Sequence, residues 1–342
     1  MSRILLAFSG GVDSSVAAYL CRESGFDVLA VNMRLLPGSP DTSDMVRKAA
    51  DHLGVELRFL DLQEEFQESV MRRCWEVFAS GKTPNPCGIC NPVFKFGTLM
   101  RFARENGCDA MATGHYVRKL ENGMLARGVH RAKDQSYFLF GLSKEQIAFA
   151  RFPLGSRTKD EVRALAASLG LPNAAAKESQ DACFTPPEGT LAEFLRKKFD
   201  APVQYGNFIH AETGEVLGRH QGIHAYTVGQ RKGTGIALGT PAYVQRIDAE
   251  RRAVYITPDE TALLRRAFRT GSVNWQTPDI PDAPFRADVQ IRYRTPAAPA
   301  TVTPCPDGSA EIVFDTPMRA ITPGQAAVVY SGETLLGGGL ID

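Results

Sequence analysis

The sequence has no apolar run near the length of about 18 residues that a membrane-spanning helix requires. It also has no excess of either charge, because 39 lysines and arginines stand against 38 aspartates and glutamates. The first absence predicts that the protein has no membrane partner. The second, a net charge of +1, gives no global sign of a nucleic-acid-binding protein, so such binding would have to depend on local patches.

Cysteine is scarce, with seven residues in 342, which is an odd number and too few for a disulfide scaffold. The chain enters a strand pattern within its first residues, so we expect no signal peptide. Together these features predict a reducing, cytoplasmic location. The content of 44% hydrophobic and 23% charged residues is ordinary for a globular protein, and the length predicts two or three domains.

The first third of the chain alternates strand and helix patterns, which is typical of a parallel sheet covered by helices. The predicted strands are residues 4–8, 27–33, 55–60 and 109–115. Between the second and third, Met45, Ala49 and Leu53 form a helical stripe that ends at Gly54. Ligands of such sheets bind beyond the carboxyl ends of the strands. We therefore expect residues 9–14, Met33, Gly114 and His115 to lie together.

Two local signals mark further elements. Residues 120–130 predict a hairpin around Asn122 and Gly123. Residues 158–161 form a capping box at the start of a helix, to which we assign no chemistry.

The composition changes at about residue 203, where Gly, Thr, Val and Tyr become frequent, and again near Arg265. We expect an α/β parallel-sheet domain over residues 1–202, a small β-rich domain over 203–262 and an antiparallel β-barrel over 263–342.

The most informative segment is residues 9–14, SGGVDS, between the first predicted strand and a helix. Two glycines let the backbone approach a phosphate, and the N–H groups of the helix then point at it. The hydroxyls of Ser9, Ser14 and Ser15 add donors, and Asp13 suits a magnesium ion. No Gly-Lys-Ser/Thr ending follows, which excludes the Walker-type loop. The alternative is a plain helix cap after an ordinary strand.

This pattern resembles the PP-loop of the N-type ATP pyrophosphatases, whose domain is Rossmann-like (adenine nucleotide alpha hydrolase-like). The resemblance implies ATP and Mg2+ as cofactors, cleavage of ATP between its α and β phosphates, and adenylation of a carbonyl-type oxygen. The nucleotide-binding residues that it implies are Ala7, Phe8, Ser9, Gly10, Gly11, Val12, Asp13, Ser14, Met33 and Gly114.

Residues 83–96 hold three prolines and the pair Cys87 and Cys90 in C-x-x-C spacing. The prolines predict a shaped loop here and not a helix. Lys95 is near enough in sequence to lower the pKa of a thiol or to contact phosphate. A further cysteine, Cys183, lies in the segment 177–184, KESQDACF. The other four have no partner spacing and are expected to be small core residues: Cys21, Cys74, Cys108 and Cys305.

The phosphate loop, the Cys-Asn-x-x-x-Lys-Phe segment at 90–96 and the Lys-x-Ser-x-x-x-Cys-Phe segment at 177–184 together resemble the tRNA-specific 2-thiouridylases. Matching blocks continue at 133–139, 224–233, 291–294 and 322–325, so the resemblance spans essentially the whole chain. It implies that ATP adenylates the C2 oxygen of the anticodon wobble uridine and that sulfur displaces AMP. It implies Cys90 as the nucleophile and Cys183 as the carrier of a persulfide, with disulfide formation driving release of the sulfur.

The implied partners are the anticodon stem-loop of a tRNA and a sulfur source, either a cysteine desulfurase, a sulfur-relay protein or free sulfide. The implied substrate contacts are Asn85, Pro86, Cys87, His115, Lys133, Asp134, Gln135, Arg292, Tyr293 and Gln325. Against this, residues 263–342 contain seven arginines and no lysine beside eight acidic residues, so that region is not basic as a whole. Taken alone, Arg292 and Tyr293 would be a solvated strand face.

The sequence departs from the family pattern at Cys87, where the family usually has Asp three residues before the nucleophile. This departure adds Cys87 to the catalytic candidates Cys90, Cys183 and Asp13. Cys87, Cys90 and Cys183 would suffice to hold a [4Fe–4S] cluster with one iron open to bind hydrosulfide. Zinc would need a fourth ligand, and none is evident. The cluster and the plain persulfide route both remain open.

Two other functions compete with a sulfurtransferase. A PP-loop ligase or amidotransferase would need neither Cys90 nor Cys183. An iron–sulfur sensor that binds RNA without catalysis would not need an intact ATP-splitting loop.

Overall fold

The computed structural model describes residues 2–37, 42–176 and 183–342, in which the chain forms two compact units. The first comprises Met1–Val70, Cys87–Asp181 and Glu333–Leu336. The second comprises Met71–Pro86, Ala182–Gly332 and Gly337–Asp342. Within the described ranges, no helix is long and apolar enough to cross a membrane.

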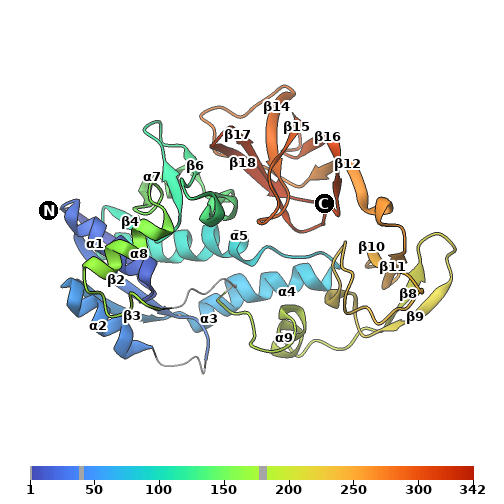
Figure 1. Cartoon of the computed structure of the whole chain (residues 1–342), viewed down its shortest axis with the longest axis horizontal. Coiled ribbons are helices and arrows are strands. Elements are labelled where there is room, and N and C mark those ends of the chain that lie inside the picture. The colour runs from blue at the N-terminus through green and yellow to red at the C-terminus, as the bar shows by residue number, and fades with distance from the viewer. Residues whose placement is uncertain (1, 38–41, 177–182) are drawn as a thin grey trace. The chain divides into compact units, whose positions relative to one another are not determined.

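A five-stranded parallel sheet forms the centre of the first unit, in the order β3-β2-β1-β4-β7. Figure 1 shows β2, β3 and β4 of this sheet beside α1 and α8. Its strands are β1 (Arg3–Ala7), β2 (Asp27–Arg34), β3 (Glu56–Asp61), β4 (Ala110–Ala112) and β7 (Ala150–Arg151). The central strand β1 is fully buried at Ile4, Leu5 and Leu6, as its apolar run without alternation predicts. The predicted parallel α/β sheet is confirmed.

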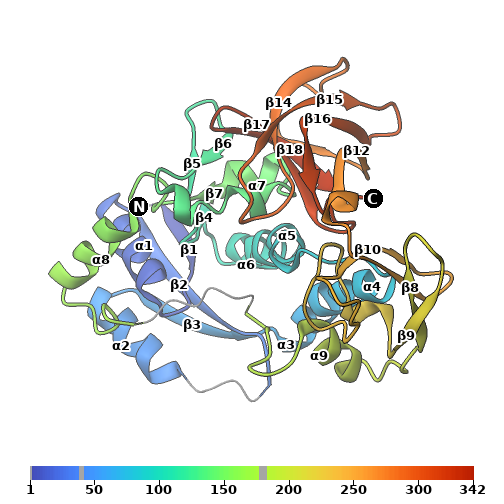
Figure 2. The same cartoon turned by 45° about the vertical axis from the view of Figure 1, so that its right-hand side comes forward.

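Helices cover both faces of this sheet. Figure 2 shows α1 and α8 on one face and α6 on the other. The helices of this unit are α1 (Val12–Glu23), α2 (Ser43–Leu53), α3 (Gln63–Phe66), α5 (Pro86–Cys90), α6 (Leu99–Glu105), α7 (Lys144–Phe149) and α8 (Lys159–Ser168). Short π and 3-10 segments are η1 (Gln67–Met71), η2 (Asn91–Thr98), η3 (Arg131–Lys133) and η4 (Ser136–Leu139).

The local signals give mixed outcomes. The capping box is confirmed, because Thr158 Oγ1 accepts a hydrogen bond from Glu161 N. The hairpin is confirmed by strands β5 (Val117–Lys119) and β6 (Leu125–Arg127). The stripe predicted for α2 is confirmed at Ala49 and Leu53, which are buried, and wrong at Met45, which is 38% exposed while its neighbour Val46 is buried.

The predicted loop around the C-x-x-C pair is wrong. Pro86 begins helix α5, which contains both cysteines, and the π-helical segment η2 follows directly. Proline fits the first turn of a helix, where its missing N–H would have no partner inside the helix. Pro84 and Pro86 therefore lie at the entry to a helix, Pro92 lies in the π-helical segment that continues it, and the prolines do not prevent helix formation.

The second unit holds two helices and two groups of strands. The helices are α4 (Arg72–Ala79) and α9 (Leu191–Lys198), and the short 3-10 segments are η5 (Ile223–Ala225) and η6 (Glu260–Leu263). The smaller sheet has the order β10-β11-β8-β9, from β8 (Gly206–His210), β9 (Val216–His220), β10 (Tyr243–Asp248) and β11 (Ala253–Thr257). Its core contains Phe208, Val244, Val254 and Ile256.

The remaining strands form the antiparallel arrangement expected of a barrel, in the order β12-β16-β15-β14-β17-β18. They are β12 (Leu264–Thr270), β13 (Asn274–Trp275, paired with β18), β14 (Phe285–Gln290), β15 (Ala298–Pro304), β16 (Ala310–Arg319), β17 (Ala326–Ser331) and β18 (Thr334–Leu340). Strand β18 begins in the first unit, where Thr334 pairs with Ala126.

Three of the four cysteines expected in a core are buried, namely Cys21, Cys74 and Cys108. The fourth expectation is wrong, because Cys305 is only half-buried. It lies in the turn between β15 and β16, outside both strands.

Candidate active site

The turn between β1 and α1 requires glycine at residue 10. Gly10 has φ +76°, and a Cβ there would lie 2.6 Å from Val46 Cγ2. Gly11 is the N-cap of α1, with extended backbone and no capping side chain. A helix of 12 residues thus presents its first N–H groups at an uncapped N-terminus, which is the geometry of an anion site.

The hydroxyls of Ser9 and Ser14 lie beside this turn. Ser9 Oγ lies 3.2 Å from Ser14 Oγ and accepts a long hydrogen bond of 3.3 Å from Gly11 N. Ser14 Oγ donates to Gly11 O at 3.0 Å. The expectation that Ser15 adds a third donor is wrong, because its side chain is fully buried and bonded to Asn173.

Asp13 is paired with a lysine that sequence reasoning treated as part of a helix cap alone. Lys159 Nζ lies 2.7 Å from Asp13 Oδ1, and Tyr116 Oη donates to the same oxygen at 2.8 Å. The side chain of Lys159 is only 6% exposed, whereas that of Asp13 is 33% exposed. The capping-box pattern gives no signal for this pair, since the two residues are 146 positions apart.

The prediction that Gly114 lies beside this turn is confirmed, and residues of β2 contact Phe8 just before it. Phe8 N donates to Val31 O in β2, and Asn32 Nδ2, in the same strand, donates to Phe8 O. A Cβ on Gly114, which follows β4, would meet Asp13 and Ser14 at 3.4 Å. Ala7 ends β1, and Met33, in β2, is half-buried.

Residues 113–116 contact both this turn and η2, the segment that follows helix α5 with its two cysteines. The His115 ring is buried, with Nδ1 2.7 Å from Thr113 Oγ1, and its centroid lies 6.2 Å from that of Phe96 in η2. Burial lowers the pKa of His115 well below 6.5, and the charge of Lys95 lowers it further. The imidazole is therefore neutral, and its side chain sits among protein groups.

Helix α5 carries Cys87 and Cys90 three residues apart, so both thiols lie on one face of the helix. Cys90 is buried, with 6% exposure, and Cys87 is half-buried. Burial raises the pKa of the Cys87 thiol above its ordinary value, and the Lys95 charge offsets part of that rise. Cys87 is thus a thiol at neutral pH.

Cys183 is exposed and belongs to the second unit. Residues 177–182 lie outside the described residues. Of the predicted Lys-x-Ser-x-x-x-Cys-Phe motif, the structure therefore describes only Cys183 and Phe184. In the ranges that the structure describes, no three His, Cys, Asp or Glu side chains gather as a metal site.

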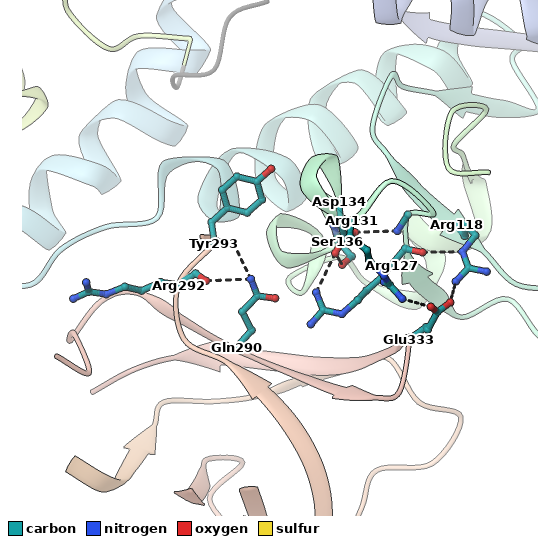
Figure 3. Close-up of polar contacts among 10 residues, drawn as sticks. Arg118, Arg127, Arg131, Asp134, Ser136, Gln290, Arg292, Tyr293 and Glu333 are labelled. Carbon is teal, nitrogen blue, oxygen red and sulfur yellow. Dashed lines mark hydrogen bonds and ion pairs between the residues drawn. The ribbon is translucent and has the colours of Figure 1, made fainter. Parts of the chain in front are cut away.

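The segment 133–135 has a buried acid at its centre (Figure 3). Asp134 accepts hydrogen bonds from Arg127 Nη1 at 3.1 Å, from Gly128 N at 3.0 Å and from Ser136 N and Oγ. Gln135 Oε1 accepts from Tyr116 N. These two side chains hold the local backbone, and Lys133 is half-buried on η3.

In the second unit, Arg292 Nη2 donates to Val228 O, Ala320 O and Thr322 Oγ1. Gln290 Nε2 donates to the carbonyls of Arg292 and Tyr293, as the dashed lines in Figure 3 show. Nη2 of Arg292 is therefore engaged in hydrogen bonds within the protein, and the Gln290 side chain holds the backbone at Arg292 and Tyr293.

Gln325 ties the chain that leads to Cys87 to the barrel strands. Its Nε2 donates to Thr83 O at 3.1 Å and to Pro84 O at 2.8 Å. Thr83 N donates in turn to Pro323 O. Asn85, the next residue along, is buried. We call residues 83–85 the strap.

Three family models match the chain in order. They are described as the tRNA methyl transferase HUP domain (residues 2–187), the tRNA methyl transferase PRC-barrel domain (192–258) and the aminomethyltransferase beta-barrel domain (265–341). The expected order of an α/β PP-loop-type domain, a small β-rich domain and a β-barrel is confirmed.

Among curated relatives, the tRNA-specific 2-thiouridylase MnmA of Nostoc punctiforme is 41% identical over 100% of this chain and 99% of its own length. That of Syntrophotalea carbinolica is 43% identical over 99% of this chain and 98% of its own. Among solved structures, a 4-thiouridine synthetase–RNA complex with bound ATP covers 58% of this chain and 50% of its own. It does so with 20% identity and a TM-score of 0.37.

Proposed function

The chain belongs to the tRNA-specific 2-thiouridylase family, and from this membership we propose that it is an ATP-dependent tRNA 2-thiouridylase. The structural observation that carries the proposal is the position of residues 113–116. Tyr116 bonds Asp13 of the phosphate loop, and His115 packs on Phe96 just beyond Cys90. One segment thus packs against both the loop that would activate the substrate and the helices around the nucleophile.

The chemistry needs both parts because a uridine carbonyl has no leaving group. Its C2 oxygen attacks the α-phosphorus of ATP, and pyrophosphate leaves with the electron pair of the broken P–O bond. Sulfur then attacks C2, and AMP leaves with the oxygen. The N–H groups of α1 and the hydroxyls of Ser9 and Ser14 would bind the phosphates, which develop charge in the first step.

Asp13 fits a magnesium ion, which prefers carboxylate and phosphate oxygens. Its Oδ1 is held by Lys159 and Tyr116, and its Oδ2 accepts no hydrogen bond from any described residue. When bound, the ion would neutralise phosphate charge. Lys159 and Tyr116 would hold the carboxylate in place for it.

For the sulfur step we propose Cys90 as the nucleophile and Cys183 as the carrier of a persulfide that a cysteine desulfurase or sulfur-relay protein supplies. Cys90 is shielded by burial, whereas Cys183 is exposed and thus open to a donor protein. A thiolate is a strong nucleophile even when only a small fraction is ionised. Once the outer sulfur of the persulfide is bound to C2, Cys90 Sγ would attack Cys183 Sγ. The S–S bond of the persulfide would break, its electron pair would stay on the sulfur bound to C2, and a Cys90–Cys183 disulfide would form.

A [4Fe–4S] cluster is the second candidate, because Cys87 places another thiol on the same helix face as Cys90. These two side chains offer two of the three ligands required, and the described residues hold no complete set. We therefore derive no step through a cluster. Iron and acid-labile sulfide in protein purified without oxygen would support this candidate, and full activity of colourless protein with a persulfide donor would exclude it.

We propose the anticodon stem-loop of tRNA as the substrate and the cytoplasm as the location. Lys133, His115, Arg292 and Tyr293 remain proposed contacts, with Asn85, Pro86 and Cys87 beside the target base. Asp134, Gln135 and Gln325 would act by holding the backbone, since their side chains already bond protein groups. We keep 1–202, 203–262 and 263–342 as the proposed domain boundaries.

The deciding experiment incubates the protein with ATP, magnesium, a persulfide source and unmodified tRNA, then digests the RNA and measures 2-thiouridine by mass spectrometry. Cys90→Ser and Cys183→Ser should abolish the product. Cys305→Ser is the matched control and should retain it, because Cys305 lies half-buried in a barrel turn. Full turnover by either of the first two variants would contradict the proposal.

A further inference from the structure

Asn173 contacts the phosphate loop from a distant part of the sequence. It follows α8, is 3% exposed, and donates from Nδ2 to Gly10 O at 2.6 Å and to Ser15 Oγ at 2.9 Å. Gly10 and Ser15 are 163 and 158 positions away in sequence. One buried amide therefore contacts the loop before α1 and the first turn of α1.

The orientation of this amide is fixed by its neighbours. The opposite orientation would place Oδ1 against Gly10 O, so that two acceptors would face each other. In the orientation observed, Oδ1 is buried and accepts no hydrogen bond from any described residue. A buried acceptor without a partner is unfavourable, which indicates that the contact to Gly10 O determines how the side chain is placed.

The contact to Gly10 O has a direct consequence for the next N–H group. A trans peptide is planar, and its C=O and N–H point in opposite directions. Holding the Gly10 carbonyl on the Asn173 side therefore turns the Gly11 N–H to the other side. There it makes only the long bond of 3.3 Å to Ser9 Oγ, an exchangeable partner at the exposed edge of the loop.

We propose that Asn173 is a positioning residue that orients the Gly10–Gly11 peptide, so that the Gly11 N–H is presented to a phosphate of the nucleotide. That the nucleotide is ATP rests on the proposed function. Because Gly10 has φ +76° and no side chain, its peptide has several accessible orientations, and an external donor is needed to select one. Fixing it before binding removes an ordering cost from nucleotide affinity.

The test measures the Kd for ATP by calorimetry and the Kd for tRNA in parallel. Asn173→Ala should raise the Kd for ATP about tenfold, the value of one hydrogen bond to the loop, and leave the Kd for tRNA unchanged. Asn91→Ala is the matched control. Asn91 is 1% exposed, also donates to a backbone carbonyl, that of Phe138, and also has a buried Oδ1 without a partner among described residues. The Asn91→Ala variant should lose about as much stability as Asn173→Ala and keep the ATP affinity of the wild-type protein.

Asn173→Asp carries the same test if the alanine variant fails to fold, because it keeps the volume and removes the donor. A folded variant of either kind with unchanged ATP affinity would overturn the inference. Failure of the wild-type protein to bind ATP would overturn both the inference and the proposed function. ATP binding that depends on Asn173, in a protein that makes no 2-thiouridine, would overturn the proposed function alone.

Discussion

At the scale of single residues, Gly10 is the position where backbone geometry and space both exclude a side chain. Gly10→Ala should destabilise the fold by about 1–3 kcal/mol and abolish ATP binding, because a Cβ would meet Val46 Cγ2. Thermal unfolding and calorimetry measure the two effects.

Gly25→Ala is the control that separates backbone strain at positive φ from the steric clash of a Cβ with Val46. Gly25 has a similar φ of +84°, but a Cβ added there would have nothing within 4 Å. It should lose some stability and keep its ATP affinity. Equal loss of ATP binding in both variants would show that strain alone explains the effect at Gly10.

Asp13 lies next to the phosphate loop glycines and accepts hydrogen bonds from two buried donors, Lys159 and Tyr116. Asp13→Asn should slow adenylation about 10- to 100-fold, because the charge-assisted pair with Lys159 and the proposed ligand of the magnesium ion are both lost. Release of AMP and pyrophosphate measures the step. The alkylation rates of the cysteines should stay unchanged.

Asp160→Asn is the control for this substitution, since Asp160 is exposed in the first turn of the same helix as Lys159. Wild-type adenylation by Asp13→Asn would show that the Asp13–Lys159 pair is purely structural.

Cys87 should react slowly with iodoacetamide at neutral pH, because burial raises its pKa and only the thiolate is alkylated. The Lys95 charge lowers that pKa, so Lys95→Met should move the midpoint of the alkylation profile to still higher pH. Peptide mass spectrometry across a pH series gives the profile. A midpoint that moves to lower pH in Lys95→Met would contradict this account of Cys87.

At the scale of elements, the entry to α5 shows why prolines misled the sequence prediction. Pro86 lies at the start of the helix, where a missing N–H costs nothing, and Pro92 is the second residue of η2, which continues α5 directly. Gln146 then bonds the carbonyls of Pro92 and Phe96, groups that a regular α-helix would pair internally. The helix is stabilised by a partner about 50 residues away, which the local pattern does not contain.

The strap depends on Gln325 in a similar way. Gln325→Glu should loosen residues 83–85, because a carboxylate cannot donate to the carbonyls of Thr83 and Pro84 and would face them with the same charge sign. Hydrogen exchange at Thr83 should accelerate, and 2-thiouridine formation should fall. Gln221→Glu, at an exposed glutamine of the same unit, should change neither. Unchanged exchange at Thr83 would contradict the role of Gln325.

At the scale of the whole molecule, the two compact units should respond differently to nucleotide. A ligand that binds only the folded state stabilises it, by about 2.7 kcal/mol at 100 times Kd. We expect saturating ATP and magnesium to slow hydrogen exchange in residues 9–16 and around Asn173. Exchange in strands β14 and β17 of the second unit should stay unchanged. Protection confined to the barrel strands would place the nucleotide elsewhere.

The near absence of net charge has a consequence at this same scale. A chain with a charge of +1 has no long-range attraction for RNA as a whole, so recognition must depend on a few side chains placed by the fold. Several residues suggested as contacts prove to be engaged within the protein, among them Asp134 and Arg292. This fits a surface in which bonded side chains hold the backbone in position.

Local sequence patterns were enough to predict the parallel sheet, the phosphate loop, the hairpin and the capped start of α8. Each of these depends on residues close together in the chain, whose spacing and conformational limits act locally. The pairing of Asp13 with Lys159, the contact of Asn173 with Gly10 and the hold of Gln325 on the strap emerged only from the folded chain. These contacts join residues more than 140 positions apart, and no local pattern contains both partners before packing brings them together.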